Sequence, residues 1–286
     1  MIARIIKIVS RQYRLMDENG QRYDAILMGK VRRQDAPAAG DLVEAEFTDG
    51  RWVVQKIMPR RNRLYRPYVC NVDQALIVMS VRDPDFSAVL VDRLSMLIRH
   101  AGIMPVLIVT KCDLDISEDT EARIQEYEHS AMPVIRTSMM QADEQVAAVL
   151  KGKISVLTGQ SGAGKSTLLN TLEPSFRLQT QEISKALGRG KHTTRHNELH
   201  EVAGGLVADT PGFSSLDFSR IEEKELDACM LDFEPYLGQC RFNDCVHQNE
   251  PGCAVKAAVE QKKIPLVRYQ NYLAVLEMIQ NRKEKY

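Results

Sequence analysis

The stretch KISVLTGQSGAGKSTLLN, residues 153–170, decides the fold of this chain. Its first residues are mostly apolar and predict a strand, and its last residues predict the start of a helix. The loop between them fits the pattern G-x4-G-K-S. In this pattern glycines turn backbone N–H groups toward the phosphates, the lysine reaches the β- and γ-phosphates, and the serine holds Mg²⁺. The stretch therefore predicts an α/β domain that binds a nucleoside triphosphate.

This loop supplies most of the residues that we expect around the nucleotide. Lys165 is also expected to act in catalysis, and Ser166 is expected to hold Mg²⁺. The positive end of the helix that follows adds to the attraction for phosphate. The residues expected to bind from this loop are Gly159, Gln160, Ser161, Gly162, Ala163, Gly164, Lys165, Ser166 and Thr167.

A second signature, TKCD at residues 110–113, follows an apolar run that predicts a buried parallel strand. Asp113 can accept two hydrogen bonds from the N1–H and the exocyclic amine of guanine, a donor pair that adenine lacks. The stem of Lys111 can lie along the base. Thr110 stands where this signature usually has Asn, which alters one supporting hydrogen bond. The signature therefore predicts a guanine nucleotide.

The order of the two signatures is permuted, because the phosphate loop comes first in an ordinary GTPase. Between them, Thr137 and Ser138 follow the apolar residues 132–135. They are placed like a short motif whose backbone contacts the guanine oxygen, so Ser138 joins the expected nucleotide-binding residues. A permuted order keeps the pocket and reroutes the chain around it.

Residues 209–212, DTPG, follow a predicted strand and have the features of switch II. The carboxylate of Asp209 is suited to hold Mg²⁺ through a water, and the N–H of Gly212 is suited to contact the γ-phosphate. Such a turn can exist in two states. It leads directly into the C-terminal part of the chain, which predicts that the nucleotide is coupled to that part.

Residues 188–195, GRGKHTTR, lie where switch I must supply a hydroxyl group to Mg²⁺. We expect Thr194 to do so and to act in catalysis, with Thr193 as the alternative ligand. The alternative for the whole stretch is a surface loop without this role. Many GTPases orient the attacking water with a glutamine after the switch II glycine, but this chain has Phe213. His192 is then the nearest titratable candidate for catalysis. Its alternative is a loop histidine that binds RNA phosphate or nothing.

A third pattern, C-x4-C-x-H-x5-C, lies near the C-terminus and predicts a structural zinc site. Three thiolates and one imidazole fill the four positions of such a site and leave none for water. A disulfide pair is the rival, which the expected reducing compartment disfavours. The expected ligands are Cys240, Cys245, His247 and Cys253, with Cys229 as a weaker substitute.

Together, the permuted order, the GQSGAGKST loop, GRGKHTT, DTPGF and the cysteine–histidine pattern resemble the RsgA (YjeQ) family of circularly permuted GTPases. The resemblance covers nearly the whole chain. It implies an N-terminal OB-like β-barrel, a permuted GTPase domain and a C-terminal, mainly helical zinc-binding domain. It also implies weak GTP hydrolysis that is stimulated by the small ribosomal subunit, with a role in the late maturation of that subunit.

Composition adds the class of protein and a charge asymmetry. With 286 residues, 44% of them hydrophobic and 27% charged, the chain is long enough for two or three globular domains. The net charge is zero, but residues 1–66 hold 14 basic and 8 acidic residues, a net charge of +6. No apolar run is long enough to span a membrane. We therefore expect a cytoplasmic protein that inserts into no membrane, and the resemblance implies a monomer that binds the rRNA of the small subunit.

Periodicity predicts three domains: a barrel over residues 1–65, the GTPase domain over 66–222 and the zinc-binding domain over 223–286. Short strands separated by turn signals fill the first, and alternating strands and helices fill the second. A charged helix from residue 266 to about 285 ends the chain. The basic run 56–66 has the pattern of a phosphate contact and equally that of a solvated linker.

Three functions from different classes fit these features. The first is a GTPase that binds the small ribosomal subunit, with Mg²⁺ and one structural Zn²⁺. The second is an rRNA-binding scaffold that is regulated by the nucleotide and hydrolyses it negligibly, which Phe213 keeps open. The third is a zinc-stabilised ATPase, against which Asp113 argues.

Overall fold

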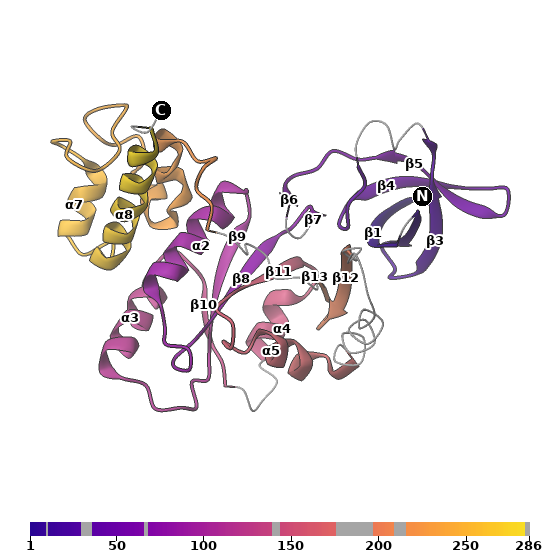
Figure 1. Cartoon of the computed structure of the whole chain (residues 1–286), viewed down its shortest axis with the longest axis horizontal. Coiled ribbons are helices and arrows are strands. Elements are labelled where there is room, and N and C mark those ends of the chain that lie inside the picture. Colours follow the sequence, from indigo (N-terminus) through magenta and orange to yellow (C-terminus); the bar gives the residue numbers. More distant parts are fainter. Residues whose placement is uncertain are drawn as a thin grey trace. The chain divides into compact units, whose positions relative to one another are not determined.

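A computed structural model describes residues 1–9, 11–29, 36–65, 68–138, 144–175, 197–208 and 216–283 (Figure 1). The chain forms two compact units. The first contains residues 1–74, 141–157 and 166–212, and the second contains residues 75–140, 158–165 and 213–286. The three domain boundaries expected from periodicity stay predictions.

The first unit begins with a closed five-stranded barrel. Its strands are β1 (Ile2–Val9), β2 (Gln12–Met16), β3 (Arg22–Leu27), β4 (Leu42–Thr48) and β5 (Arg51–Ile57). They follow the order β1-β2-β3-β5-β4, and pairing between β1 and β4 closes the ring. Alternate apolar residues such as Ile5, Leu15 and Val54 point inward and are buried. The predicted small β-barrel is confirmed.

A short hairpin of β6 (Arg63–Tyr65) and β7 (Tyr68–Cys70) follows the barrel, where the sequence predicted only a basic run. In that run, the guanidinium of Arg60 pairs with the carboxylate of Asp41 at 2.6 Å. The two side chains are only 10% and 0% exposed. Arg60 therefore ties the segment after β5 to the residue before β4, and the phosphate contact predicted from the run stays a prediction.

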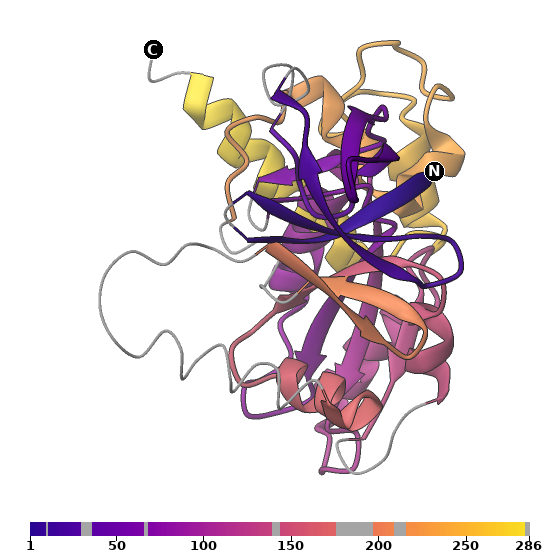
Figure 2. The ribbon, with the colours of Figure 1, turned by 90° about the vertical axis from the view of Figure 1, so that its right-hand side faces the viewer.

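The rest of the first unit carries α4 (Glu144–Leu150), α5 (Lys165–Leu172) and three strands, which are β11 (Ile154–Gly159), β12 (Asn197–Val202) and β13 (Gly205–Ala208). β13 runs parallel to β11 and forms an antiparallel hairpin with β12. β12 in turn pairs with β1 of the barrel, and Figure 2 shows the hairpin beside the barrel strands. The sequence did not predict β12, so this connection was unexpected.

The second unit contains the alternating strands and helices that the sequence predicted. They are β8 (Gln74–Ser80), α2 (Ala88–His100), β9 (Met104–Thr110), α3 (Glu118–Glu128) and β10 (Val134–Arg136). All seven residues of β8 are buried, as expected for a central strand of a parallel sheet. Ser87 and Ser117 cap the two helices, because their hydroxyls accept backbone N–H groups of the first turn.

The C-terminal part of the second unit consists of three 3-10 helices and two α-helices. They are η1 (Glu223–Glu225), η2 (Asp227–Cys229), η3 (Leu231–Tyr236), α7 (Ala254–Glu260) and α8 (Leu266–Lys283). The helix predicted from residue 266 is confirmed, and its residues Tyr272, Leu276 and Ile279 are buried. They share one core with Met96 and Leu97 of α2. We call residues 216–283 the C-terminal segment.

A buried charge cluster lies at the contact between the C-terminal segment and α2. The guanidinium of Arg268 on α8 is fully buried. It lies 3.3 Å from the carboxylate of Asp92 on α2 and 2.9 Å from that of Asp232 on η3. It also stacks over the ring of Tyr127 on α3, 5.1 Å from its centre. Asn271 donates to the second oxygen of Asp92 at 2.6 Å. The cluster joins α2, α3 and α8.

Candidate functional site

The phosphate loop follows β11 and adopts a backbone that requires glycine. Gly159, Gly162 and Gly164 have φ angles of 122°, 83° and 91°, a region that other residues rarely enter. A Cβ at Gly159 would lie 2.0 Å from the carbonyl oxygen of Val78 on β8. A larger residue would therefore clash with the backbone of the central strand. The local structure agrees with the loop predicted from the sequence.

Lys165 ends this loop and begins α5. Its ammonium group donates to the carbonyl oxygens of Gly159 at 2.9 Å and Gln160 at 2.5 Å. Partial burial lowers the pKa of this lysine. The charge is thus held over the loop by backbone carbonyls. Ser166 and Thr167, also expected at the site, lie exposed in the first turn of α5.

Thr110 connects the predicted guanine-reading turn to the phosphate loop. Its side chain is fully buried at the end of β9, and its hydroxyl donates to the carbonyl oxygen of Ala163 at 2.7 Å. The same hydroxyl lies 3.3 Å from the carbonyl oxygen of Met79 on β8. The threonine that replaces the usual asparagine therefore ties the two signatures together.

Lys111 is held in place by the turn between β8 and α2. It has a positive φ of 59°, and its ammonium group donates to the carbonyl oxygens of Arg82, at 3.3 Å, and Asp83. Asp113 follows it and is exposed. Placed beyond a buried strand end, this carboxylate is accessible to a base.

Thr137 and Ser138 lie next to this turn, as the sequence predicted. The N–H of Cys112 donates to the carbonyl oxygen of Thr137 at 3.2 Å, and the N–H of Thr137 donates to that of Val109 at 2.8 Å. Thr137 is buried, and its hydroxyl donates to the carbonyl oxygen of Ser138 at 3.2 Å. The structure therefore gathers the phosphate loop, the guanine-reading turn and this short motif from three separate parts of the chain.

The remaining expected nucleotide residues lie outside the described residues. These are His192, Thr193, Thr194, Asp209 and Gly212. Their expected roles stay predictions. Two described strands lie next to them along the chain. β12 begins at Asn197, shortly after Thr194, and β13 ends at Ala208, just before Asp209.

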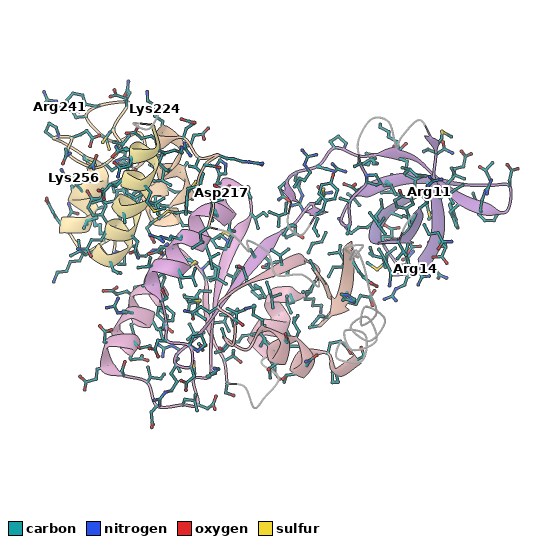
Figure 3. All side chains as sticks on the ribbon, viewed as in Figure 1. Arg11, Arg14, Asp217, Lys224, Arg241 and Lys256 are labelled. Carbon is teal, nitrogen blue, oxygen red and sulfur yellow. The ribbon has the colours of Figure 1, made fainter. Side chains whose placement is uncertain are left out.

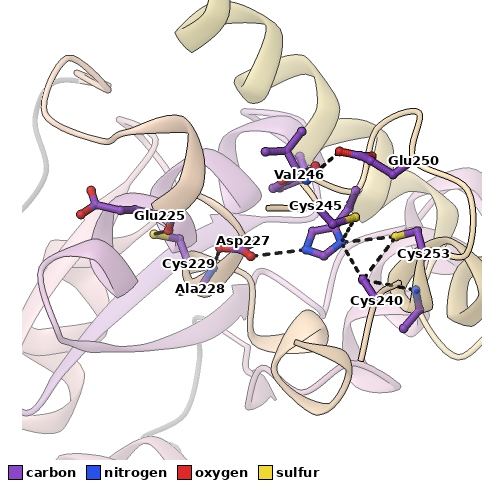
Figure 4. A network of polar contacts seen from close by, with 12 residues as sticks. Glu225, Asp227, Ala228, Cys229, Cys240, Cys245, Val246, Glu250 and Cys253 are labelled. Carbon is purple, nitrogen blue, oxygen red and sulfur yellow. Dashed lines mark hydrogen bonds and ion pairs between the residues drawn. The ribbon is translucent and has the colours of Figure 1, made fainter. Parts of the chain in front are cut away.

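The C-terminal cysteine–histidine pattern forms one cluster (Figure 4). Nδ1 of His247 lies 3.5, 3.5 and 3.3 Å from the sulfurs of Cys240, Cys245 and Cys253, and the sulfurs of Cys240 and Cys253 lie 3.9 Å apart. Tetrahedral zinc with bonds of ~2.3 Å to sulfur and ~2.0 Å to nitrogen requires edges of about 3.5 Å and 3.8 Å. The four predicted ligands are thus brought together at spacings that fit one zinc ion.

Groups around the cluster hold its ligands in place. Nε2 of His247 lies 3.3 Å from the carboxylate of Asp227, which fixes Nδ1 as the atom facing the sulfurs. The hydroxyls of Tyr269 and Tyr272 on α8 donate to the carbonyl oxygens of His247 and Val246 at 2.7 and 2.8 Å. The sequence did not predict these contacts. Asp227 lies too far along the chain for any spacing rule to connect it with the histidine.

Cys229, the weaker candidate ligand, lies outside the cluster. Its thiol contacts the carbonyl oxygen of Glu225 at 3.4 Å and is buried in the apolar core. Burial raises its pKa to about 12, which disfavours the thiolate that a metal needs. All six cysteines are free thiols, so the rival interpretation as a disulfide is not supported.

Sequence comparison identifies relatives along the whole chain. Residues 57–219 match the family model described as RsgA GTPase. A protein of Bacillus subtilis (strain 168) named small ribosomal subunit biogenesis GTPase RsgA is 42% identical, with 99% of each chain covered. A protein of Oceanobacillus iheyensis named small ribosomal subunit biogenesis GTPase RsgA 2 is 44% identical, also with 99% of each chain covered.

Two solved structures have the same fold. The crystal structure of YloQ, described as a circularly permuted GTPase, superposes with a TM-score of 0.84 and 36% identity, covering 98% of this chain and 95% of that one. The crystal structure of YjeQ from Thermotoga maritima gives a TM-score of 0.83 and 33% identity, covering 98% of both chains. This chain belongs to the RsgA family of circularly permuted GTPases.

Proposed function

We propose that this protein hydrolyses GTP to GDP and phosphate while it assists the late maturation of the small ribosomal subunit, and that the subunit stimulates the hydrolysis. The bond from the Thr110 hydroxyl to the Ala163 carbonyl carries the proposal. It joins a turn that can read guanine to a loop that can hold phosphates. The names of the relatives supply the ribosomal partner.

The residues of the site would divide the work between binding and hydrolysis. Asp113 would accept hydrogen bonds from guanine, and Lys165 would neutralise charge on the β- and γ-phosphates. Mg²⁺, when bound, would neutralise charge that develops on the phosphates. Ser166 and Thr194 would hold it, with Thr193 as the alternative and Asp209 acting through a water.

The hydrolytic water needs a partner that the usual glutamine does not supply. We propose His192 for this role, because Phe213 occupies the position after Gly212 and cannot accept a proton. The backbone N–H of Gly212 would contact the γ-phosphate. If His192 does not act, water must be oriented by backbone groups or by rRNA.

The metal-ligand cluster would hold one Zn²⁺ in a structural role. Burial opposes ionisation of the Cys240 thiol, but the N–H of Ala254 and the neighbouring cysteines lower its pKa. All four positions of a tetrahedral ion would be filled by protein atoms, so no water could be activated there. Zinc fits this donor set better than a hard cation, because Mg²⁺ prefers oxygen ligands.

The rRNA would meet basic side chains at both ends of the chain. Arg11 and Arg14 lie on the barrel, and Lys224, Arg241 and Lys256 lie on the C-terminal segment (Figure 3). Contacts of this kind bind phosphate without reading sequence and weaken as salt rises. We propose that the protein acts as a monomer in the cytoplasm. In the part of the chain that the structure describes, no helix has the length and apolar character to cross a membrane.

GTP turnover with and without purified small subunits tests this function. We expect turnover that rises with the subunit, and a fall of roughly 10²-fold in the stimulated kcat for His192→Ala with GTP affinity nearly unchanged. Turnover that stays negligible with the subunit present, while GTP still binds, would favour the scaffold that is regulated by nucleotide.

Nucleotide competition tests the choice of base. Asp113→Asn replaces an acceptor oxygen by a donor, so GTP affinity should fall at least about tenfold and xanthine nucleotide affinity should rise. The matched control is Asp115→Asn, which changes an exposed aspartate two residues further along. Equal affinity of the wild-type protein for ATP and GTP would leave Asp113 without this role.

A further inference from the structure

The hairpin of β12 and β13 is fixed at its turn. The N–H of Gly152 donates to the carbonyl oxygen of Gly204 at 2.9 Å, and the N–H of Leu206 donates to that of Lys153 at 2.9 Å. A Cβ at Gly205 would lie 2.0 Å from the carbonyl oxygen of Leu150, so the turn is packed tightly against the end of α4. This end of the hairpin has no room to move.

The opposite end of the hairpin leads to both predicted switches. Leu199 of β12 pairs with Ala208 of β13, and Ala208 is the last residue before the predicted switch II at 209–212. The predicted switch I, at 188–195, ends just before β12 begins. A change in either switch would therefore reach this end of the hairpin first.

β1 of the barrel is attached at that same end. Lys7 of β1 lies opposite Glu198 of β12 in the ladder, and its ammonium group lies 2.7 Å from the carboxylate. A second ion pair, nearer the fixed turn, joins Arg22 of β3 to Glu201 of β12 at 3.1 Å. Two strands of the barrel thus hold one strand of the hairpin.

The contact between the barrel and β12 is polar and contains a cavity. A cavity of about 390 Å³ lies along it, lined mainly by charged side chains of β1, β2, β3 and β12 together with Glu173 and Ser175. The ion pairs are partly exposed, at 34% and 17% for Lys7 and Glu198 and about half for Arg22 and Glu201. A contact held largely by partly exposed ion pairs can open and close at little cost.

The C-terminal segment is attached in the opposite way. Arg268 is fully buried between Asp92 and Asp232, and an apolar core surrounds the contact with α2. Detaching the segment would expose this apolar core to water and break the buried ion pairs, which is costly. The segment is therefore a fixed extension of α2 and α3.

We propose that the barrel reports the nucleotide state through the pairing of β1 with β12, whereas the C-terminal segment stays fixed on α2. This inference rests on the proposed function, because it needs a nucleotide that acts on the segments flanking the hairpin. It also replaces the coupling that sequence order alone predicts, from switch II directly into the C-terminal segment.

Backbone hydrogen exchange of the full-length protein tests the proposal, with GDP and with a non-hydrolysable GTP analogue. We expect the rates of amide hydrogen exchange in β1 and β12 to differ at least about threefold between the two nucleotides, and the rates in α8 to be the same. Lys7→Glu or Glu198→Lys should reduce this difference about two- to fivefold, and the double exchange Lys7→Glu with Glu198→Lys should restore it. The matched control is Arg51→Glu, because Arg51 is exposed on β5, which pairs with β3 and β4.

Each outcome has a distinct meaning. Identical exchange of β1 and β12 with both nucleotides bound would overturn the proposal, and so would a change in α8 as large as that in β1. Single charge reversals that leave the difference intact would also overturn it. Failure of either guanine nucleotide to bind, measured by titration of the same samples, would instead contradict the proposed function.

Discussion

The barrel and the C-terminal segment are attached by contrasting kinds of contact. The barrel meets β12 through a short ladder with β1 and partly exposed ion pairs from β1 and β3, and each pair contributes about 0.2–1 kcal/mol. α8 meets α2 through an apolar core and the buried Arg268, where loss of one partner costs about 3–5 kcal/mol. The contact between the barrel and β12 is suited to a reversible change, whereas the contact between α8 and α2 is suited to a fixed attachment.

The difference teaches that order along a permuted chain does not determine which part follows the nucleotide. The predicted switch II runs directly into the C-terminal segment, which suggests coupling there. The contacts in space suggest the barrel instead, because β12 lies beside β1. Four changes test this comparison, from the largest expected effect to the smallest.

Removal of the metal should unfold the C-terminal segment. Binding energy at a structural zinc site is folding energy, on the order of 10–16 kcal/mol. Because Met96 and Leu97 share its core, α2 should loosen as well, while the barrel stays folded. Elemental analysis and hydrogen exchange after chelation measure both effects. As a control, Cys229→Ser should keep the metal, whereas protection of α8 in metal-free protein would contradict the account.

Truncation of Arg268 should be the most damaging single change at the C-terminal contact. Arg268→Ala leaves Asp92 and Asp232 buried without their cation, so the free energy of unfolding should fall by about 3–5 kcal/mol. Urea denaturation measures this loss. Arg123→Ala, which breaks an exposed ion pair with Asp119, should change it by less than about 0.5 kcal/mol. Equal losses in the two variants would show that the cluster does not fasten α8.

The pH dependence of stability should carry the signature of Asp92. Burial raises its pKa to about 6, with Arg268 opposing the shift. Between about pH 4 and pH 6, the carboxyl group of Asp92 is therefore protonated in the folded state and ionised in the unfolded state. This group therefore makes the protein less stable as pH rises through that window, by at most about 1.4 kcal/mol per pH unit. Denaturation of wild type and Asp92→Asn across this range should show a smaller slope in the variant.

The exposed ion pairs of the barrel should matter least for stability. Arg22→Ala breaks the pair with Glu201, and Arg14→Ala breaks the pair with Asp24. Each should lower the free energy of unfolding by no more than about 1 kcal/mol. A loss as large as that of Arg268→Ala would remove the contrast between the two attachments.

Much of the fold could be predicted because its signals are local. The sequence predicts strands over 74–80 and 104–110 and a helix over 144–150, and β8, β9 and α4 have these bounds. Continuous apolar runs or a helical pattern with clear ends specify them. β12 was missed because its sequence, NELHEV, is largely polar and its partner β1 lies far away in the chain. The hairpin of β6 and β7 was missed because basic residues dominate it.

The candidate site divides in the same way. The phosphate loop and the metal ligands follow from residue types at fixed spacings, but Asp227 and the Thr110 bond depend on tertiary contacts. The buried position of Arg268 could have been predicted from the sequence. Arg268 lies four residues before Tyr272 and seven before Val275, in the stripe of α8 that is buried. A charged residue within an apolar stripe indicates a buried ion pair.

The most direct measurement is the affinity of the full-length protein for the small subunit, with a non-hydrolysable GTP analogue and with GDP. We expect tighter binding with the analogue, a smaller ratio in Lys7→Glu and in Glu198→Lys, and a restored ratio in the double exchange. The control Arg51→Glu, on the exposed side of β5, should keep the wild-type ratio. An unchanged ratio in both Lys7→Glu and Glu198→Lys would contradict the account, since the barrel would then not follow the nucleotide through β12.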